Sequence, residues 1–156
     1  MGKKATKTLE GSDATSVVVK KINGKNLDLK KNYKIYIIAY KRVDGNAVKL
    51  GKTITAHIVG KNNKQYTNVK KVNVSQSEYS LEVGKTVKIQ ANTELVQKSK
   101  KELTNAHAKE LRYASSNKKV VTVSKKGKVK AVGTGSCIVY VYARNGYAKA
   151  IRITVR

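Results

Sequence analysis

The fold is decided by the closing stretch CIVYVYARNGYAKAIRITV, residues 137–155. On both sides of Asn145-Gly146, every second residue is a small or β-branched apolar one, and this period of two is the signature of strands with one buried face. Because Asn and Gly both tolerate positive φ, the two strands are predicted to form a hairpin. We expect Cys137 and the Val/Ile set to face the core. Tyr140 and Tyr142 should then lie on the outer face, where Lys stems can cover their rings.

The same alternation recurs toward the N-terminus. Turn signals such as Asp44-Gly45 and Lys126-Gly127 separate the runs at intervals of about ten residues, a spacing typical of a β-sandwich. The polar residues 98–110 are too short for a stable isolated helix and predict a loop with at most one helical turn. The chain is therefore predicted to be all-β. The further strands are expected at residues 17–19, 33–40, 54–59, 69–74, 79–83, 87–91, 120–123 and 129–132.

Lysine dominates the charge of the chain. The formal net charge is +25, from 34 Lys and Arg against 9 Asp and Glu, and the excess is spread over both halves. Such a coat protects exposed strand edges and keeps a protein soluble. It also attracts polyanions such as nucleic acid, teichoic acid or acidic glycan, so both interpretations stay open. The candidate polyanion-binding residues are Lys20, Lys21, Lys70, Lys71, Lys125, Lys126, Lys128 and Lys130.

Four tyrosines predict a second candidate surface. Tyr36, Tyr40, Tyr140 and Tyr142 are expected on outer strand faces, where their rings could stack on a glycan. The alternative is cross-strand aromatic pairing, which stabilises a sheet by some tenths of a kcal/mol per pair without binding anything. The sequence leaves both interpretations available.

The sequence contains no credible active site. Cys137 is the single cysteine and lies at an inward strand position, where a Cys is usually a small core residue. His57 is expected in a strand and His107 in the polar loop. The carboxylates mostly stand beside Lys, and the clustered oxygens of a calcium loop are missing. We therefore expect no catalytic residue, no metal and no cofactor.

The chain also lacks visible targeting signals. It has no apolar run of the roughly 18 residues that a membrane helix needs, so no membrane insertion is expected. No signal peptide is visible, and Met1-Gly2 looks like an added start on a fragment of a longer protein.

The C-terminal half resembles a bacterial immunoglobulin-like domain of group 2. The matching segments are LEVGKTVKI at 81–89, RYASSN at 112–117, VVTVS at 120–124, GKVKA at 127–131 and GTGSCIV at 133–139. Such domains occur in intimin- and invasin-like adhesins and in many Gram-positive surface proteins. Where the family usually has Trp or an equivalent apolar residue before Ser-Ser-Asn, this chain has Arg112-Tyr113. Tyr113 is therefore expected to fill that core position.

The N-terminal part is similar to the second half of a fibronectin type III module. The similarity rests on LDLKKNYKIYIIAY at 27–40 and GKTITA at 51–56. Leu29 and Tyr33 stand where the module has its tyrosine corner, in which the Tyr hydroxyl bonds a nearby backbone group. The resemblance implies that the module's first three strands are missing. The remaining strands should then expose an apolar face unless it packs on the second domain or on another chain.

These resemblances imply three parts and a fold. Residues 1–60 form the partial fibronectin-like module, 61–71 a polar, Lys-rich junction and 72–156 the immunoglobulin-like domain. The junction has no flexible Gly/Ser tract, so a fairly fixed relation between the two units is expected. The expected fold is all-β: an immunoglobulin-like β-sandwich preceded by a smaller, incomplete β-sandwich-like unit.

The implied function is that of a non-catalytic structural or adhesion module outside the cell, on the surface or in the wall. Its expected partners are neighbouring domains of a parent surface protein, with anionic wall polymer, glycan or host ligand as further candidates. The alternative is a basic nucleic-acid-binding protein. Three features weigh against it: the charge is spread evenly along the chain, Arg is scarce, and no recognition motif is present. Only non-specific nucleic-acid binding is therefore expected.

Overall fold

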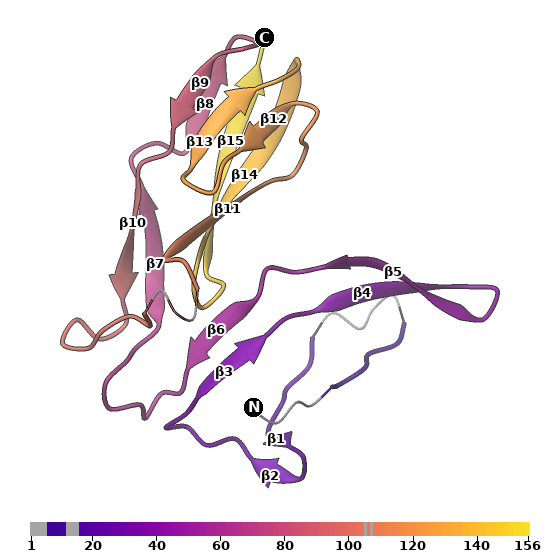
Figure 1. Ribbon diagram of the computed structural model, residues 1–156, viewed down its shortest axis with the longest axis vertical. Coiled ribbons are helices and arrows are strands. Elements are labelled where there is room, and N and C mark those ends of the chain that lie inside the picture. The colour runs from indigo at the N-terminus through magenta and orange to yellow at the C-terminus, as the bar shows by residue number, and fades with distance from the viewer. Residues whose placement is uncertain (1–5, 12–15, 105, 107) are drawn as a thin grey trace.

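The computed structural model describes residues 6–11, 16–104, 106 and 108–156, and within these ranges the chain is all-β with no helix. Figure 1 shows an upper sandwich formed by the C-terminal strands and a lower unit that extends sideways from its base. The strands are β1 Lys21–Ile22, β2 Lys25–Asn26, β3 Asn32–Ile35, β4 Ile38–Val43, β5 Asn46–Lys52, β6 Ala56–Val59, β7 Val69–Val74, β8 Glu78–Leu81, β9 Thr86–Lys88, β10 Ala91–Leu95, β11 Leu111–Ser115, β12 Val121–Val123, β13 Lys128–Ala131, β14 Gly135–Ala143 and β15 Ala148–Val155.

Two sheets make the C-terminal sandwich. One has the strand order β11-β14-β15-β8, and the other has the order β12-β13-β9. All of their pairings are antiparallel except that of β15 with β8, which is parallel. The antiparallel pair β7–β10 extends the sandwich downward, toward the lower unit (Figure 1).

The core lies between these sheets, and the closing strands contribute most of it. In β14 the burial alternates as predicted: Cys137, Val139, Val141 and Ala143 are buried, whereas Tyr140 and Tyr142 are only partly covered. β15 does the same with Ile151, Ile153 and Val155, and β13 with Val129 and Ala131. The predicted all-β sandwich and the face assignment of the closing hairpin are confirmed.

Turn geometry agrees with the sequence except in one detail. Both residues have positive φ in Asn23-Gly24 and in Asp44-Gly45, as mirror-image hairpin turns require. At the closing hairpin only Gly146 does, with φ of 87°. The amide of Gly146 donates to Ala143 O and the amide of Ala143 to Tyr147 O, so the loop is longer than two residues. The predicted hairpin is confirmed, although only the glycine of its Asn-Gly pair has positive φ.

One local prediction needs correction, and the loop predicted at residues 98–110 is confirmed in its described part. Residues 17–19 do not form a strand, because no described segment pairs with them, and Val18 is 79% exposed. The described part of 98–110 contains no helical turn; a hydrogen bond from Lys100 N to Gln97 O closes one simple turn. Leu103 is nevertheless 2% exposed, so this polar segment is anchored by an apolar side chain.

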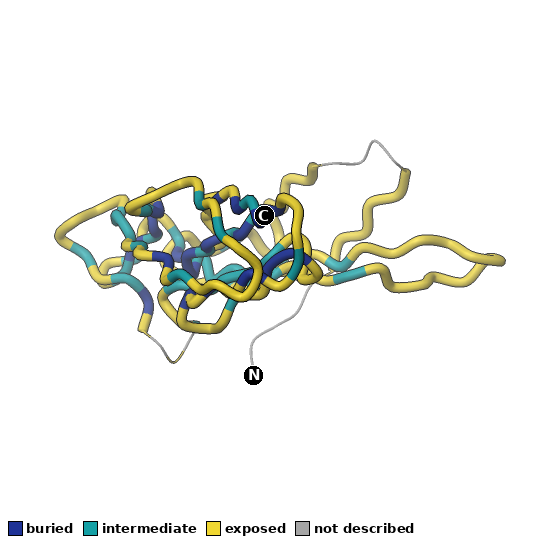
Figure 2. The backbone as a smooth tube through the Cα atoms, turned by 90° about the horizontal axis from the view of Figure 1, so that it is seen from above, coloured by how far each residue is buried: buried dark blue, intermediate teal, exposed yellow. Residues whose placement is uncertain are grey.

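The N-terminal unit is built on one long, bent hairpin. β3 pairs with β6 near the sandwich, and β4 pairs with β5 beyond it. Tyr33 donates its hydroxyl to Asp28 O at 2.9 Å, the backbone bond expected of a tyrosine corner. We call β4, β5 and their turn, residues 38–52, the arm. Figure 2 shows the arm exposed along nearly its whole length, while the buried segments gather in the sandwich.

Candidate functional site

The predicted lysines do not form one patch. Lys20 and Lys21 lie at the small β1–β2 hairpin, Lys70 and Lys71 in β7, and the remaining four in or beside β13. These are three separate sheets. All eight side chains are exposed, and Lys70 is paired with Glu94 at 3.5 Å. A basic surface is thus found at several places, with its greatest local density at the β12–β13 turn.

The outer face of the β12-β13-β9 sheet collects lysines that the sequence alone does not bring together. Lys88 in β9 stands directly opposite Lys128 in β13, and Lys130 follows on the same face. Like charges opposite each other on neighbouring strands destabilise a sheet. Lys88 Nζ is also hydrogen-bonded to Lys126 O. An open hollow on this face is lined by Thr86, Thr122, Lys128 and Lys130, among others. We call Lys88, Lys128 and Lys130 the basic sheet face.

Lys88 was missed because its place depends on strand register. The pattern of residues 87–91 predicts a strand, of which β9 contains the first two residues, but it does not predict which strand pairs with it. Val87 opposite Val129 points into the core, which turns Lys88 and Lys128 outward together.

The four tyrosines lie in two separate parts of the chain, and Tyr36, between β3 and β4, is in no strand. Tyr140 and Tyr142 lie on the outer face of β14 with ring centroids 5.8 Å apart and planes tilted by 35°. Burial raises the pKa of the Tyr142 hydroxyl, with Tyr140 as a second cause. Tyr36 and Tyr40 belong to the N-terminal unit, where Lys52 Nζ lies 3.9 Å from the centre of the Tyr36 ring. The expected glycan platform, if used, would therefore consist of two independent pairs.

Cys137 has the surroundings of a core residue. It is 6% exposed, its sulfur lies 4.0 Å from Ser115 Oγ, and burial raises the pKa of the thiol. His57 is at the other end of β14, where its amide donates to Arg144 O. Seven strand residues separate that point from Cys137, which corresponds to about 23 Å. His57 and Cys137 cannot form a catalytic pair, and His107 lies outside the described residues.

Other chemistry finds no support in the described part of the chain. It contains no group of three or more His, Cys, Asp or Glu side chains placed to hold a metal ion. None of its segments is a helix long and apolar enough to cross a membrane.

A buried polar cluster lies where the two units meet. Arg144, 6% exposed, places its guanidinium 3.2 Å from the carboxylate of Glu102 and donates through Nε to Ala108 O at 2.8 Å. Burial raises the pKa of Glu102, against the opposite influence of Arg144. This pair fastens the segment around Glu102 and Ala108 to the end of β14.

Arg112 and Asn68 connect the sandwich to the N-terminal unit. Arg112 donates to Ala143 O at 2.8 Å and also to Thr55 O, just before β6. The Asn68 side chain accepts a hydrogen bond from the amide of Val59 at 2.8 Å and donates one to Val59 O at 2.7 Å. It thus makes the two backbone bonds that a neighbouring strand would make. Burial, and then the nearby Arg144, lower the pKa of Arg112. The backbone of β6 is thereby held by side chains of the sandwich.

The sequence carried one unused signal for this cluster. The chain has many lysines but only five arginines, and two of these five, Arg112 and Arg144, lie in the polar cluster where the two units meet. A guanidinium offers several fixed donors and is weakly hydrated, which suits it to partly buried carbonyls better than an ammonium group. Arg112 and Arg144 thus serve as structural donors, whereas Arg42, Arg152 and Arg156 are exposed.

Solved structures show similar arrangements at low identity. An intimin mutant from EHEC O157:H7 is 13% identical with a TM-score of 0.41, covering 55% of this chain and 46% of that chain. Domains 4 and 5 of the S-layer protein SbsC are 14% identical with a TM-score of 0.45, covering 65% and 58%. A longer SbsC structure, rSbsC(31-844), is 12% identical with a TM-score of 0.48, covering 86% and 21%. The chain thus spans less than two thirds of each of these structures. No curated protein matches it.

The family match covers the sandwich described above. Residues 68–154 match the model of the bacterial Ig-like domain (group 2). The match begins at Asn68, the residue that clasps Val59, and takes in every strand from β7 onward. Because it extends over more than half of the residues, the chain belongs to the bacterial Ig-like domain (group 2) family.

Proposed function

We propose that the chain is a non-catalytic module of a bacterial cell-surface protein, where it serves as a spacer and binds anionic wall polymer or glycan. The single observation that supports binding is the basic sheet face. Lys88 and Lys128 stand opposite each other without a carboxylate between them among the described residues. A bound polyanion would relieve that repulsion.

The spacer role is supported by the hydrogen bonds between the N-terminal unit and the sandwich. The carbonyl of Thr55, the amide of Val59 and the amide of His57 are all bonded to the sandwich. A unit held by several such bonds transmits orientation better than one on a Gly/Ser linker. Neighbouring domains of a parent protein would then be presented at a defined angle.

The test measures binding of purified poly(glycerol phosphate) to the full chain over a range of NaCl concentrations. The triple variant Lys88→Gln/Lys128→Gln/Lys130→Gln should bind more weakly, and its affinity should fall less steeply with salt, because fewer counterions are released. The matched control removes three exposed lysines that are not among the candidate binding residues, with Lys61→Gln/Lys64→Gln/Lys98→Gln.

Three results contradict the binding proposal. Equal weakening in both triple variants means that net charge acts without a site. Binding that does not respond to salt removes the electrostatic argument. Tighter binding to a DNA duplex of equal charge, lost in the same variant, supports a nucleic-acid-binding protein instead.

A further inference from the structure

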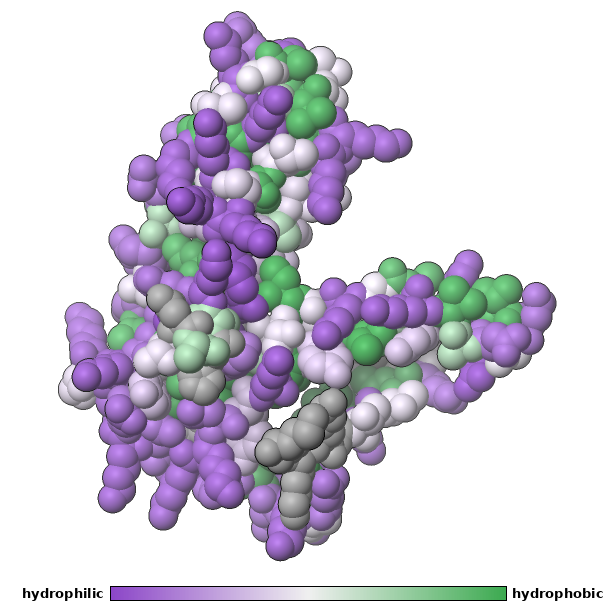
Figure 3. Space-filling model, in the orientation of Figure 1, coloured by the Kyte–Doolittle hydropathy of each residue, from purple (hydrophilic) through white to green (hydrophobic). Residues whose placement is uncertain are grey.

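The arm is exposed along nearly its whole length. Its two strands pair only with each other among the described strands, so each has a backbone edge without a strand neighbour. Leu50 is 61% exposed, Tyr40 55%, Val48 42% and Val43 39%. Apolar patches run along the arm in Figure 3. A two-stranded ribbon is marginal in water without a third strand or a cover, so the arm has the features of an incomplete sheet.

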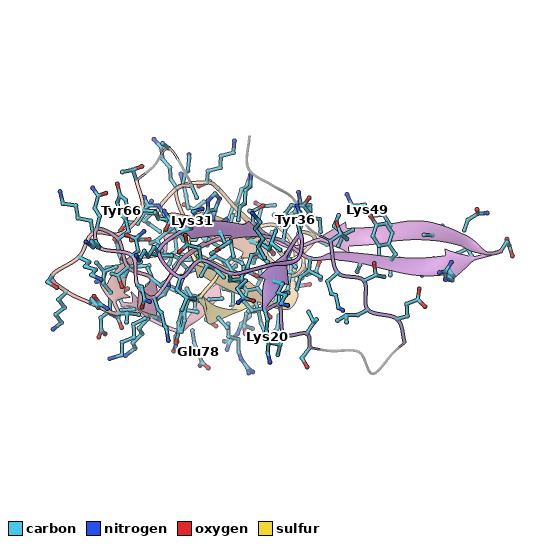
Figure 4. The ribbon with its side chains drawn as sticks, turned by 90° about the horizontal axis from the view of Figure 1, so that it is seen from below. Lys20, Lys31, Tyr36, Lys49, Tyr66 and Glu78 are labelled. Atoms are coloured by element: carbon cyan, nitrogen blue, oxygen red, sulfur yellow. The ribbon has the colours of Figure 1, made fainter. Side chains whose placement is uncertain are left out.

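The register assigns the side chains of the arm to two faces. Lys41 stands opposite Val48 and lies two residues before Val43 in the same strand. All three side chains therefore lie on one face of the arm. Tyr40 stands opposite Lys49, and Ile38 opposite Lys52, so both lysines project from the other face. Arg42 shares that face by alternation with Tyr40. Figure 4 shows Lys49 on the arm and Tyr36 near its base. The basic face of the arm thus carries Arg42, Lys49 and Lys52 beside Tyr40 and Ile38, whereas the other face carries Val43, Val48 and Lys41.

The charge of the arm determines which kind of strand could pair with its edge. The arm carries Lys41, Arg42, Lys49 and Lys52 against a single acidic residue, Asp44. Lysines on an exposed edge block pairing with a like-charged strand. A second copy of this chain, with its own +25 charge, would place lysines against lysines. The same lysines favour a strand whose carboxylates fall on the basic face.

One carboxylate already occupies that face. Glu10 reaches Arg42 with its oxygen 3.2 Å from the guanidinium, and both side chains are well exposed. This contact lies beside β4, which makes the edge of β5 the more open of the two. The arrangement shows the polarity that an added strand would need, with acidic side chains toward the basic face.

We propose that the edge of β5 is a docking site for an extended acidic segment of a partner protein, in which apolar and acidic residues alternate. The segment would add as a third strand through backbone hydrogen bonds. Its apolar side chains would lie beside Val48, and its carboxylates beside Lys49 and Lys52. This inference concerns the N-terminal unit and does not depend on polymer binding by the sandwich.

The experiment titrates the full chain with a fluorescently labelled, eight-residue peptide that alternates valine and glutamate, at near-physiological salt. Anisotropy gives the affinity, and amide hydrogen exchange locates the contact. Binding should slow exchange in β5, Asn46–Lys52. Lys49→Glu/Lys52→Glu should weaken binding about tenfold, because two attractions become repulsions. The same double variant should bind a peptide in which lysine replaces each glutamate more tightly than the wild type does.

The controls separate a site from general attraction. Lys118→Glu/Lys119→Glu changes the net charge equally at an exposed loop of the sandwich and should leave the affinity nearly unchanged. A peptide of the same composition without alternation should bind poorly. Equal loss in both variants, equal binding of the rearranged peptide, or no protection in β5 overturns the proposal. Concentration-dependent self-association that protects β5 without any peptide would make a second copy the occupant instead.

Discussion

The sharpest test of the architecture compares one substitution at two isoleucines. Ile151 in β15 is 0% exposed and pairs with Val139 inside the core, whereas Ile37, just before the arm, is 67% exposed. Replacing a buried Ile by Ala loses transfer free energy and leaves a cavity, which costs about 3 kcal/mol. At Ile37 only about a third of the side chain is covered, so the same change should cost less than about 1 kcal/mol.

Urea unfolding followed by far-ultraviolet circular dichroism measures both values. With a slope of about 1.5 kcal/mol/M, Ile151→Ala should lower the unfolding midpoint by about 2 M. The midpoint for Ile37→Ala should move by less than about 0.7 M. If the N-terminal unit unfolds separately, the first transition reports Ile37 and the second Ile151.

Two results would refute this reasoning. A large loss at Ile37 in the isolated chain would mean that the face beside the arm is already covered. A loss below about 1 kcal/mol at Ile151 would mean that the closing strands do not bury what their alternation indicates.

Three further outcomes follow from single sites. Gly127→Ala should destabilise the sandwich by about 1–2 kcal/mol, since Gly127 has a φ of 77° and a Cβ there would meet the Tyr113 ring at 2.7 Å; chemical denaturation checks it, and an unchanged midpoint contradicts it. The Cys137 thiol should react with Ellman's reagent only as fast as the sandwich opens, because it is buried with a raised pKa. Immediate reaction of the folded protein at pH 8 would show an open site. Glu102 has a raised folded pKa, so the folded state favours its neutral form; the stability of the wild type relative to Glu102→Gln should fall as the pH rises from about 4 through that pKa. If the stability of the wild type relative to Glu102→Gln rose with pH instead, the attraction of Arg144 for the ionised carboxylate would outweigh the effect of burial on the pKa of Glu102.

Much of the sandwich could be predicted because its strands have one wet face. In β14 and β15 the alternating pattern identified the inward residues, and Tyr113 packs against the core as the family resemblance implied. Burial also raises the pKa of Tyr113. The region 46–52 was not predicted as a strand, since both faces of β5 are wet and its period is interrupted by an extra residue, Leu50, at a bulge. Without a buried face, the pattern that marks a strand is lost.

The polar cluster where the two units meet could not be predicted, because its contacts join residues far apart in sequence. Arg144 follows a strand and precedes a turn, a place that usually faces solvent. Its burial depends on Glu102 and Ala108, which belong to a loop that the sequence shows only as polar. The basic sheet face has the same origin, since Lys88 and Lys128 meet only through the register of β9 with β13.

The parallel pairing of β8 with β15 has a mechanical consequence. Arg152, Ile153, Thr154 and Val155 stand beside Glu78, Tyr79, Ser80 and Leu81, with both strands running the same way. A tensile load that pulls the start of the sandwich and its C-terminal end apart would slide these strands along each other. The bonds of the ladder would then share the load and fail together, instead of opening one at a time as a zipper does. The strand order alone thus makes this sandwich resistant to shear along the line of the chain.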